Sequence, residues 1–334
     1  MRGHGRFRGT CAAIMSALLV AVAALALGAC GGSSTTSSTA ASVSTTPSDA
    51  SAAAQVARTE AVVKALTTTW NTAWSANRSR DALSSFFADD VMYYDATIVG
   101  VFTKSDLDAM VQDPTWWKSF QLHLDSFFVS PDGRFAATLG RIALRDDSGH
   151  LPWQPGASVM AFANDKVVWN YDYYGGEPGK TRQTEPMLTI PRSAVAPGSA
   201  PAQAAVAEAT ATIERWLAAF NGRDATTFLS SYADRARYID VVSPRWRVMS
   251  KRQLAADVAN QFPEADFQSE LEPPTGSAMD SSFFVSADGR FAAVQGTYFD
   301  ARAQRLMLVI LELEGGKIVR QYNFIAMDRS LLRP

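Results

Sequence analysis

The chain contains one phrase of fifteen residues twice. It reads SFFVSPDGRFAATLG from Ser126 and SFFVSADGRFAAVQG from Ser282, so 12 of the 15 positions are identical and the copies start 156 residues apart. In both copies β-favouring residues flank an Asp-Gly pair, and glycine accepts the positive φ that a tight turn requires. The phrase therefore predicts a β-hairpin in each half of the chain.

The likeness between the halves extends well beyond this hairpin. The segment 73–95 matches 219–240 upstream, and 165–175 matches 316–326 downstream, in the same order along the chain. A period of this length is too long for a solenoid and fits a duplicated domain. With 334 residues and 47% apolar side chains, the chain has enough material for two cores. We predict one domain at 55–177, a Pro/Gly-rich linker at 178–203, and a second domain at 204–334.

Each half has the same predicted order of elements. Apolar residues at helical spacing come first, and alternating strands follow. The second helix is predicted to begin at Asp81 or Asp224 and to include Phe87 or Tyr232. The third helix of the second copy starts with the spacing of a capping box at 250–253. The predicted fold class is α+β: two tandem cone-shaped domains, each with three N-terminal helices packed on a curved antiparallel sheet.

The first 29 residues have the layout of a secretory signal. A basic leader precedes a long apolar run that ends in Leu-Gly-Ala-Cys, which resembles a bacterial lipobox. This pattern predicts cleavage before Cys30, lipidation of that cysteine, and a Ser/Thr-rich tether at 30–54. The alternative is an uncleaved membrane helix, because the run approaches the length of a bilayer span. The lipoprotein hypothesis places the protein on the extracytoplasmic side of the cell membrane.

Composition argues against several classes of partner. The formal net charge of −2 gives no electrostatic footprint for nucleic acid. Only two cysteines and three histidines are present, and both cysteines, Cys11 and Cys30, lie in the N-terminal segment. These numbers leave little material for a zinc or histidine-rich metal site. We therefore predict neither a metal nor a cofactor.

Three motifs resemble a known superfamily. They are Asn-Gly-Arg-Asp at 221–224, the aromatic-Ala-Asp runs at 87–95 and 232–240, and the closing Gly-Lys-Ile-Val at 316–319. Each half is similar to SnoaL-like or ketosteroid-isomerase-like domains of the nuclear transport factor 2-like superfamily. The resemblance implies a curved sheet wrapped around helices and a conical apolar cavity. Some members of that superfamily isomerise or cyclise polyketide-like or steroid substrates, and many only bind, dimerise or regulate.

The resemblance also points to particular carboxylates. Asp95 and Asp240 fall where the isomerase branch places its general base, and an aromatic side chain, Tyr93 or Tyr238, lies two residues earlier on the same strand face. Burial would raise the pKa of such a carboxylate toward the range useful for proton abstraction. The alternative is a pair of strand-end carboxylates that accept hydrogen bonds from backbone N–H groups.

The closing strand supplies another candidate base. In Tyr171-Asp172-Tyr173-Tyr174, the pattern places Asp172 and Tyr174 on one face of the strand. The second copy has Asn323 where the first has Asp172, and an amide keeps hydrogen bonding but cannot transfer a proton. If Asp172 is a base, only the first domain is active. The alternative is an aromatic strand that only packs.

Other features depart from the isomerase pattern. The first helix of each copy offers tryptophan and no tyrosine, and Ala157 and Ser158 lie near the place expected for a second acid. Without donors aimed at a developing enolate, a base alone contributes little. The residues predicted to bind a ligand are polar or aromatic and come from both copies: Trp70, Trp74, Tyr93, Tyr171, Trp216, Tyr238, Tyr322 and Asn323.

The leading functional hypothesis is non-catalytic. An anchored protein of this kind would bind an apolar or amphipathic small molecule in a cone, or a protein partner through its sheet faces. The alternative is an isomerase, cyclase or hydratase that uses Asp95, and also Asp172, as general base. A structural role in the envelope is the third hypothesis. The sheets are also predicted to pair, either within one chain or between two copies of it.

Overall fold

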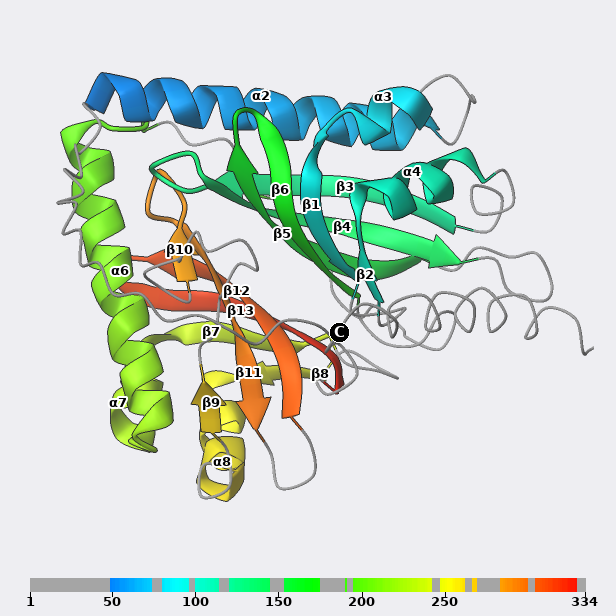
Figure 1. Ribbon diagram of the computed structural model, residues 1–334. Coiled ribbons are helices and arrows are strands. Elements are labelled where there is room, and N and C mark those ends of the chain that lie inside the picture. Colours follow the sequence, from blue (N-terminus) through cyan, green and yellow to red (C-terminus); the bar gives the residue numbers. More distant parts are fainter. Residues whose placement is uncertain are drawn as a thin grey trace, which may run out of the picture. The chain divides into compact units, whose positions relative to one another are not determined.

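The structure is a computed structural model that describes residues 49–73, 80–95, 100–113, 120–144, 153–174, 190, 195–241, 247–261, 266–268, 283–299 and 304–328 (Figure 1). The elements of the first copy are α2 (Asp49–Ala73), α3 (Arg80–Ser84), β1 (Phe87–Asp95), β2 (Gly100–Phe102), α4 (Lys104–Gln112), β3 (Phe120–Val129), β4 (Phe135–Leu144), β5 (Trp153–Ala163) and β6 (Lys166–Tyr174). The elements of the second copy are α6 (Ala200–Asn221), α7 (Ala225–Ser230), β7 (Tyr232–Asp240), β8 (Arg247–Ser250), α8 (Lys251–Gln261), β9 (Asp266–Gln268), β10 (Phe283–Val285), β11 (Phe291–Phe299), β12 (Gln304–Glu314) and β13 (Lys317–Asp328).

Each copy builds one sheet, and the strands follow the same path in both. The first sheet has the order β2-β1-β6-β5-β4-β3, and the second has the order β10-β11-β12-β13-β7-β8, with β9 paired to β11. In the first copy the long helix α2 lies along its sheet and contacts β3 (Figure 1). The predicted α+β class, with one helix-covered sheet in each copy, is confirmed.

The sheets predicted as antiparallel are mixed, because one strand pair in each copy is parallel. β1 pairs with β6 in parallel, and β7 pairs with β13 in parallel. The strands β3 to β6 form an antiparallel meander, and the earlier strand β1 then joins its last member in the same direction. Alternation of side chains in a sequence reports the two faces of a strand but not the direction of its neighbour, so the pattern could not show this.

The helix boundaries agree with the prediction in part. Asp224 caps α7, since its side chain accepts from the backbone N–H of Thr227 at 2.9 Å. The capping box at 250–253 is present, with the backbone N–H of Ser250 donating to Gln253 Oε1 at 2.9 Å. Two expectations are corrected. Phe87 and Tyr232 begin strands rather than extending the second helix, and each is the first buried residue of its strand. Helix α2 begins at Asp49, inside the segment predicted as tether.

The Asp-Gly turns of the repeated phrase lie directly against the long helices. Gly133 and Gly289 both have φ of 72°, as the hairpin prediction requires. A Cβ on Gly133 would lie 2.7 Å from the backbone of Gln55, and the Oγ1 of Thr59 donates to the carbonyl of Gly133 at 2.5 Å. Glycine is therefore needed here both for its backbone conformation and for its lack of a side chain.

Each copy has its own apolar core on the face of its sheet that packs against its long helix, which we call the inner face. Val63, Leu83 and Met160 belong to the core of the first copy. Ile213, Phe228 and Val309 belong to that of the second copy. These two separate clusters agree with the prediction that each half of the chain forms its own apolar core.

A third cluster joins the outer faces of the two sheets within the compact unit Pro47–Pro334. It combines side chains of the first copy, such as Leu139 and Trp169, with side chains of the second, such as Leu308 and Phe324. All four are buried. Ile190, from the predicted linker, packs against the same cluster. These strands carry apolar side chains on both faces. The inner face packs in the core of its own copy, and the outer face packs in the cluster that the two copies share.

The two copies of the repeated phrase contact each other in this shared cluster. The ring of Phe128 lies 5.6 Å from that of its own counterpart Phe284 and 5.8 Å from that of Phe291. Phe135, the counterpart of Phe291, stacks on Phe284 at 5.8 Å. Each side of this contact is therefore formed by one copy of the same phrase. The contact gives a physical reason why the phrase occurs in both halves of the chain.

A backbone hydrogen bond makes this contact asymmetric. The N–H of Ala287 donates to the carbonyl of Val129 at 2.9 Å. The residue that corresponds to Ala287 in the first copy is Pro131, which has no N–H to donate. The reciprocal bond therefore cannot form, and this substitution in the turn decides which copy donates.

Candidate functional site

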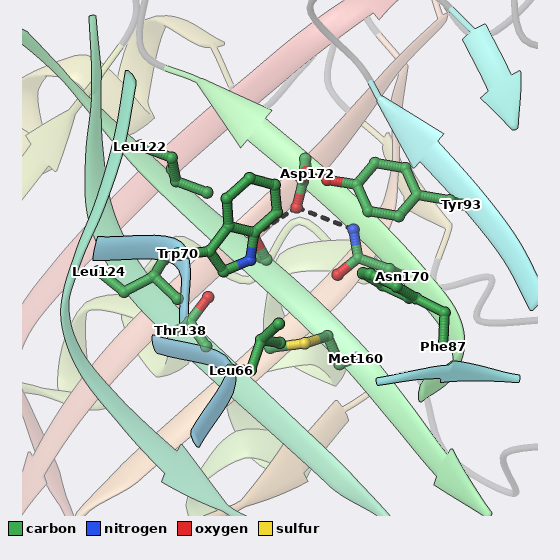
Figure 2. A pocket seen from close by; sticks show the side chains of 11 residues that line it. Leu66, Trp70, Phe87, Tyr93, Leu122, Leu124, Thr138, Met160, Asn170 and Asp172 are labelled. Atoms are coloured by element: carbon green, nitrogen blue, oxygen red, sulfur yellow. Dashed lines mark hydrogen bonds between the residues drawn. The ribbon is translucent and has the colours of Figure 1, made fainter. Parts of the chain in front are cut away.

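A small cavity lies within the first copy, between α2 and the inner face of its sheet (Figure 2). About 300 Å³ of space lies among its walls and mouth, but the centre of a water molecule can occupy only about 20 Å³ of it. The walls are mostly apolar, with a few polar groups, and are formed by Leu66, Trp70, Phe87, Tyr93, Leu122, Leu124, Thr138, Ser158, Met160, Asn170 and Asp172. A space of this size accommodates about one water molecule.

Strand β6 places Asp172 in this cavity. Asn170 and Asp172 line it, while Tyr171 and Tyr173 belong to the outer cluster. Tyr174 packs with the inner core. Because side chains alternate along a strand, Asn170, Asp172 and Tyr174 lie on one face and Tyr171 and Tyr173 on the other. The predicted pairing of Asp172 with Tyr174 on one face is therefore confirmed.

Four side chains donate hydrogen bonds to Asp172. Its Oδ1 accepts from Ser158 Oγ and from Asn170 Nδ2, the latter at 2.9 Å. Its Oδ2 accepts from the phenols of Tyr93 and Tyr174, the latter at 3.3 Å. Four donors match the acceptor capacity of an ionised carboxylate. Burial raises the pKa of Asp172, and these four donors partly offset that effect.

The two tyrosines remain protonated donors at neutral pH. Burial raises the pKa of Tyr93 well above its usual value, and the charges of Asp172 and Asp95 raise it further. The same causes act on the pKa of Tyr174. Each phenol can therefore donate to an oxygen that carries negative charge. Sequence reasoning looked for such a donor on the first helix, whereas the structure places both on strands.

Asp95 lies beside Asp172 but is not part of the cavity wall. The two residues are register partners on the parallel strands β1 and β6. Only 7% of Asp95 and 3% of Asp172 is exposed. The base suggested by the resemblance is therefore not among the residues that line the cavity, and Asp172 is the acid that faces it.

Thr138 is a cavity residue that the sequence did not single out. It lies on β4 with 1% of its surface exposed, and its Oγ1 has no hydrogen-bond partner among the residues that the structure describes. Figure 2 shows this oxygen directed toward the cavity. An unpartnered buried hydroxyl costs free energy, so it marks a place where a ligand or water atom could bind favourably. A comparison of the two repeats could have identified Thr138, because the second copy has Val294 at this position.

The second copy uses its inner polar groups differently. Trp216 Nε1 donates to the phenol of Tyr232 at 2.9 Å, and that phenol donates to Gln321 Oε1 at 2.6 Å. Gln321 Nε2 donates to Asn323 Oδ1 at 2.7 Å, and Asn323 Nδ2 donates to Asp240 Oδ1 at 2.8 Å. The inner groups thus form a chain of neutral donors and acceptors that satisfy one another.

Asp240 terminates this chain at the end of β7 and is half-buried. Burial raises its pKa, which the hydrogen bond from Asn323 and the charge of Arg247 partly offset. Tyr238 packs against the core of the second copy. In the second copy the candidate base Asp240 therefore accepts a hydrogen bond from the amide of Asn323. In the first copy four side chains donate to the carboxylate of Asp172.

The remaining predicted ligand residues fall into three groups. Trp70 and Tyr93 line the cavity of the first copy. Tyr171 and Tyr322 are corrected, since both lie on outer faces and belong to or pack against the shared cluster; Tyr171 stacks on Tyr94 at 4.2 Å. Trp74 lies outside the described residues. Cys30, the predicted lipidation site, also lies outside them.

Comparison with known proteins found similarities among solved structures. No family model and no curated protein matches the sequence. Among solved structures, a steroid delta-isomerase from Pseudomonas aeruginosa is 15% identical and covers 37% of this chain and 84% of its own, with a TM-score of 0.30. An LEH-like epoxide hydrolase from M. tuberculosis is 17% identical and covers 36% and 84%, with a TM-score of 0.29. An NTF2-like protein of unknown function from Cytophaga hutchinsonii is 9% identical and covers 37% and 93%, with a TM-score of 0.27.

Each of these matches covers 36% or 37% of this chain, which is about the length of one copy of the repeat. They are similarities of fold only. Low identity means that these relatives carry no information about the activity of this chain.

Within the described ranges, no group of three or more His, Cys, Asp or Glu side chains is placed to hold a metal ion. No helix in the described part of the chain is both long and apolar enough to cross a membrane.

Proposed function

We propose that the first domain binds a small amphipathic molecule in its cone, and that the second domain is a structural partner for it. The observation that carries this proposal is the pair of polar groups in the cavity of the first copy. Asp172 and the unpartnered hydroxyl of Thr138 face the same small apolar space. At the corresponding positions the second copy has an amide, Asn323, and the apolar Val294. Apolar walls with a few convergent polar groups are typical of small-molecule sites.

The size of the cavity limits the ligand. Sites for drug-sized molecules usually have volumes of about 300–1,000 Å³. Here the room open to a water centre is about 20 Å³, so a ligand larger than water must displace wall side chains. Trp70, which comes from α2 rather than from the sheet, is one such wall residue. The proposed ligand is therefore small, with an apolar part against the leucines and a polar group that bonds to the Thr138 hydroxyl near Asp172.

Proton-transfer catalysis is the second candidate, and one observation favours it. Asp172 lies beside two phenols that stay protonated at neutral pH, Tyr93 and Tyr174. In an isomerase or cyclase, the carboxylate would accept a proton from a carbon next to a carbonyl, and a phenol would donate to the resulting enolate oxygen. The four donors already on Asp172 argue against this as the leading function, because one must move before the carboxylate can act as base.

Bound small molecules provide the test of the proposed site. Native mass spectrometry of the full chain, isolated from the host that produces it naturally, is expected to show a co-purifying small molecule. Thr138→Val should weaken its binding about fivefold to tenfold, since one hydrogen bond contributes about 1 kcal/mol. The same change should stabilise the ligand-free fold by about 1 kcal/mol, because it removes an unpartnered buried hydroxyl.

Asp240→Asn is the matched control, because it changes an acid at the corresponding sheet edge of the second copy. It should leave the small molecule bound. A protein that never carries a bound molecule would contradict the proposal. Equal loss of the molecule in Asp240→Asn and Thr138→Val would contradict its assignment to the first domain.

We also propose that the mature chain is a lipoprotein attached through Cys30 to the extracytoplasmic side of the membrane. The support is the basic leader, the apolar run and the small residues before Cys30. Cys30→Ala should move the protein from the membrane fraction to the soluble or precursor fraction and abolish labelling by a radioactive fatty acid. Unchanged labelling in this variant would show that the lipid is attached elsewhere.

A further inference from the structure

Three inner side chains of the second copy occupy positions that form the cavity wall in the first copy. Two of these positions are on strands. Tyr232 begins β7 as Phe87 begins β1, and each pairs with the second residue of the closing strand of its copy. Gln321 on β13 has the same register position as Asn170 on β6. Phe87 and Asn170 line the cavity, whereas the phenol of Tyr232 donates to Gln321 Oε1 at 2.6 Å.

The third position is on the long helices, which the two Asp-Gly turns align with each other. A Cβ added to Gly133 would lie 2.7 Å from the backbone carbonyl carbon of Gln55, and one added to Gly289 would lie 2.4 Å from that of Ala205. Because the two glycines are equivalent in the repeated phrase, Gln55 and Ala205 are equivalent as well. Residues of α2 and α6 that are 150 positions apart therefore correspond.

The second copy fills this space with larger side chains. By the spacing on the helices, Trp216 is the counterpart of Leu66, and Phe220 is that of Trp70. Together with the two exchanges on the strands, these give the second copy about five more non-hydrogen atoms, in an interior that is normally packed without gaps. The first copy therefore leaves room for a ligand of about that size. The free space is smaller than this, because the ring of Trp70 lies across the cavity (Figure 2).

The same exchanges remove two hydrogen-bond donors from the first copy. In the second copy the indole N–H of Trp216 and the phenol of Tyr232 form a chain that ends on Gln321 Oε1. Leucine and phenylalanine have neither group, so the first copy has no equivalent of this phenol to donate to Asn170 Oδ1. The side-chain hydrogen bond that the structure shows for Asn170 runs from Nδ2 to Asp172 at 2.9 Å. Figure 2 shows Oδ1 on the side of the amide that faces away from Asp172.

We propose that Asn170 Oδ1 is a second polar contact of the ligand, and that the ligand is a neutral molecule of about five non-hydrogen atoms with a hydroxyl or N–H donor. This inference rests on the proposed function, because it requires that a small molecule binds in the cavity. The donor replaces the phenol of Tyr232, and the apolar part lies against Leu66, in place of the indole of Trp216. The wall contains the acid Asp172 and no lysine, arginine or histidine, so a carboxylate ligand is disfavoured.

Isobutanol and 2-methylbutane are matched probes, because they have the same shape and one has a hydroxyl where the other has a methyl group. NMR of the full chain measures the affinity of each, from the methyl resonances of Leu66 and Met160. Phe87→Tyr gives the first copy the phenol that Tyr232 supplies in the second, so the new hydroxyl should occupy Asn170 Oδ1 and compete with the alcohol. The ratio of isobutanol affinity to 2-methylbutane affinity should fall about fivefold to tenfold, which is the effect of losing one hydrogen bond. The size of the added oxygen acts on both probes and cancels in this ratio.

Phe127→Tyr is the control, because Phe127 packs against the core of the first copy but does not line the cavity. This variant should leave the affinity ratio unchanged. An unchanged ratio in Phe87→Tyr, with both probes still bound, would overturn the role of Asn170 and leave the proposed site intact. If neither probe binds to the wild type at its saturating aqueous concentration, the proposed small-molecule site fails, and this inference fails with it.

The same variant tests the correspondence between the copies without a ligand. Phe87 is 6% exposed, and a buried hydroxyl without a partner raises the unfolding constant about fivefold or more. If the new hydroxyl reaches Asn170 as that of Tyr232 reaches Gln321, Phe87→Tyr should unfold in urea at close to the wild-type midpoint. A marked loss of stability would show that the hydroxyl finds no acceptor, which would overturn the assignment of Asn170 whatever the probes do.

Discussion

Replacing Phe128 by alanine is expected to lower the free energy of unfolding by about 3–5 kcal/mol, which is the usual cost of removing a buried aromatic side chain. Phe128 is 5% exposed and belongs to the cluster that joins the outer faces of the two sheets. Its ring contacts Phe284 and Phe291 of the other copy, so the change removes packing that belongs to neither domain alone. Urea denaturation followed by tryptophan fluorescence measures the effect.

The neighbouring residue in the same phrase is the control. Phe127 points to the opposite face, is only half-buried and packs against the core of the first copy. Phe127→Ala should therefore cost less than Phe128→Ala. A double-mutant cycle between Phe128 and Phe284 should give a coupling of about 0.5–1.5 kcal/mol, as for other aromatic pairs in contact. Equal costs at 127 and 128, with no coupling to Phe284, would show that the sheets do not pack through this phrase.

Gly289→Ala should destabilise the protein by about 2–4 kcal/mol, since two costs add at this turn. The backbone has φ of 72°, which an L-residue with a side chain adopts only with strain. The new Cβ would also lie 2.4 Å from the backbone carbon of Ala205 and 2.5 Å from its oxygen. Because the contact is with helix backbone rather than with a flexible side chain, α6 or the whole turn must shift. Thermal and urea unfolding both measure the loss.

Gly315 separates the two costs. Its φ is also positive, at 54°, but nothing lies within 4 Å of the Cβ that alanine would add. Gly315→Ala should therefore show only the conformational cost, about 1 kcal/mol. If Gly289→Ala were no more destabilising than Gly315→Ala, the close packing of the turn on α6 would be contradicted.

The candidate site was only partly visible in the sequence. The alternation of β6 correctly separated Asp172 and Tyr174 from Tyr171 and Tyr173, because a strand side chain has only two directions to choose between. Thr138 and Asn170 were not found, since a polar residue in a strand looks the same whether it faces solvent, a partner sheet or a cavity. Comparing the two repeats would have exposed them, since Thr138 stands opposite Val294 and Asn170 opposite Gln321.

What the sequence by itself determined was local or repeated. The Asp-Gly turns, the cap at Asp224, the capping box at 250–253 and the duplication of an α+β unit all depend on residues close together in the chain or on a match between its halves. Only the tertiary structure decided that β1 joins β6 in parallel, that the outer faces share a core, and that four donors from three strands meet on Asp172. Those contacts join residues far apart in the chain, and their geometry depends on how strands pair and sheets pack, which the side-chain pattern of a single strand does not encode.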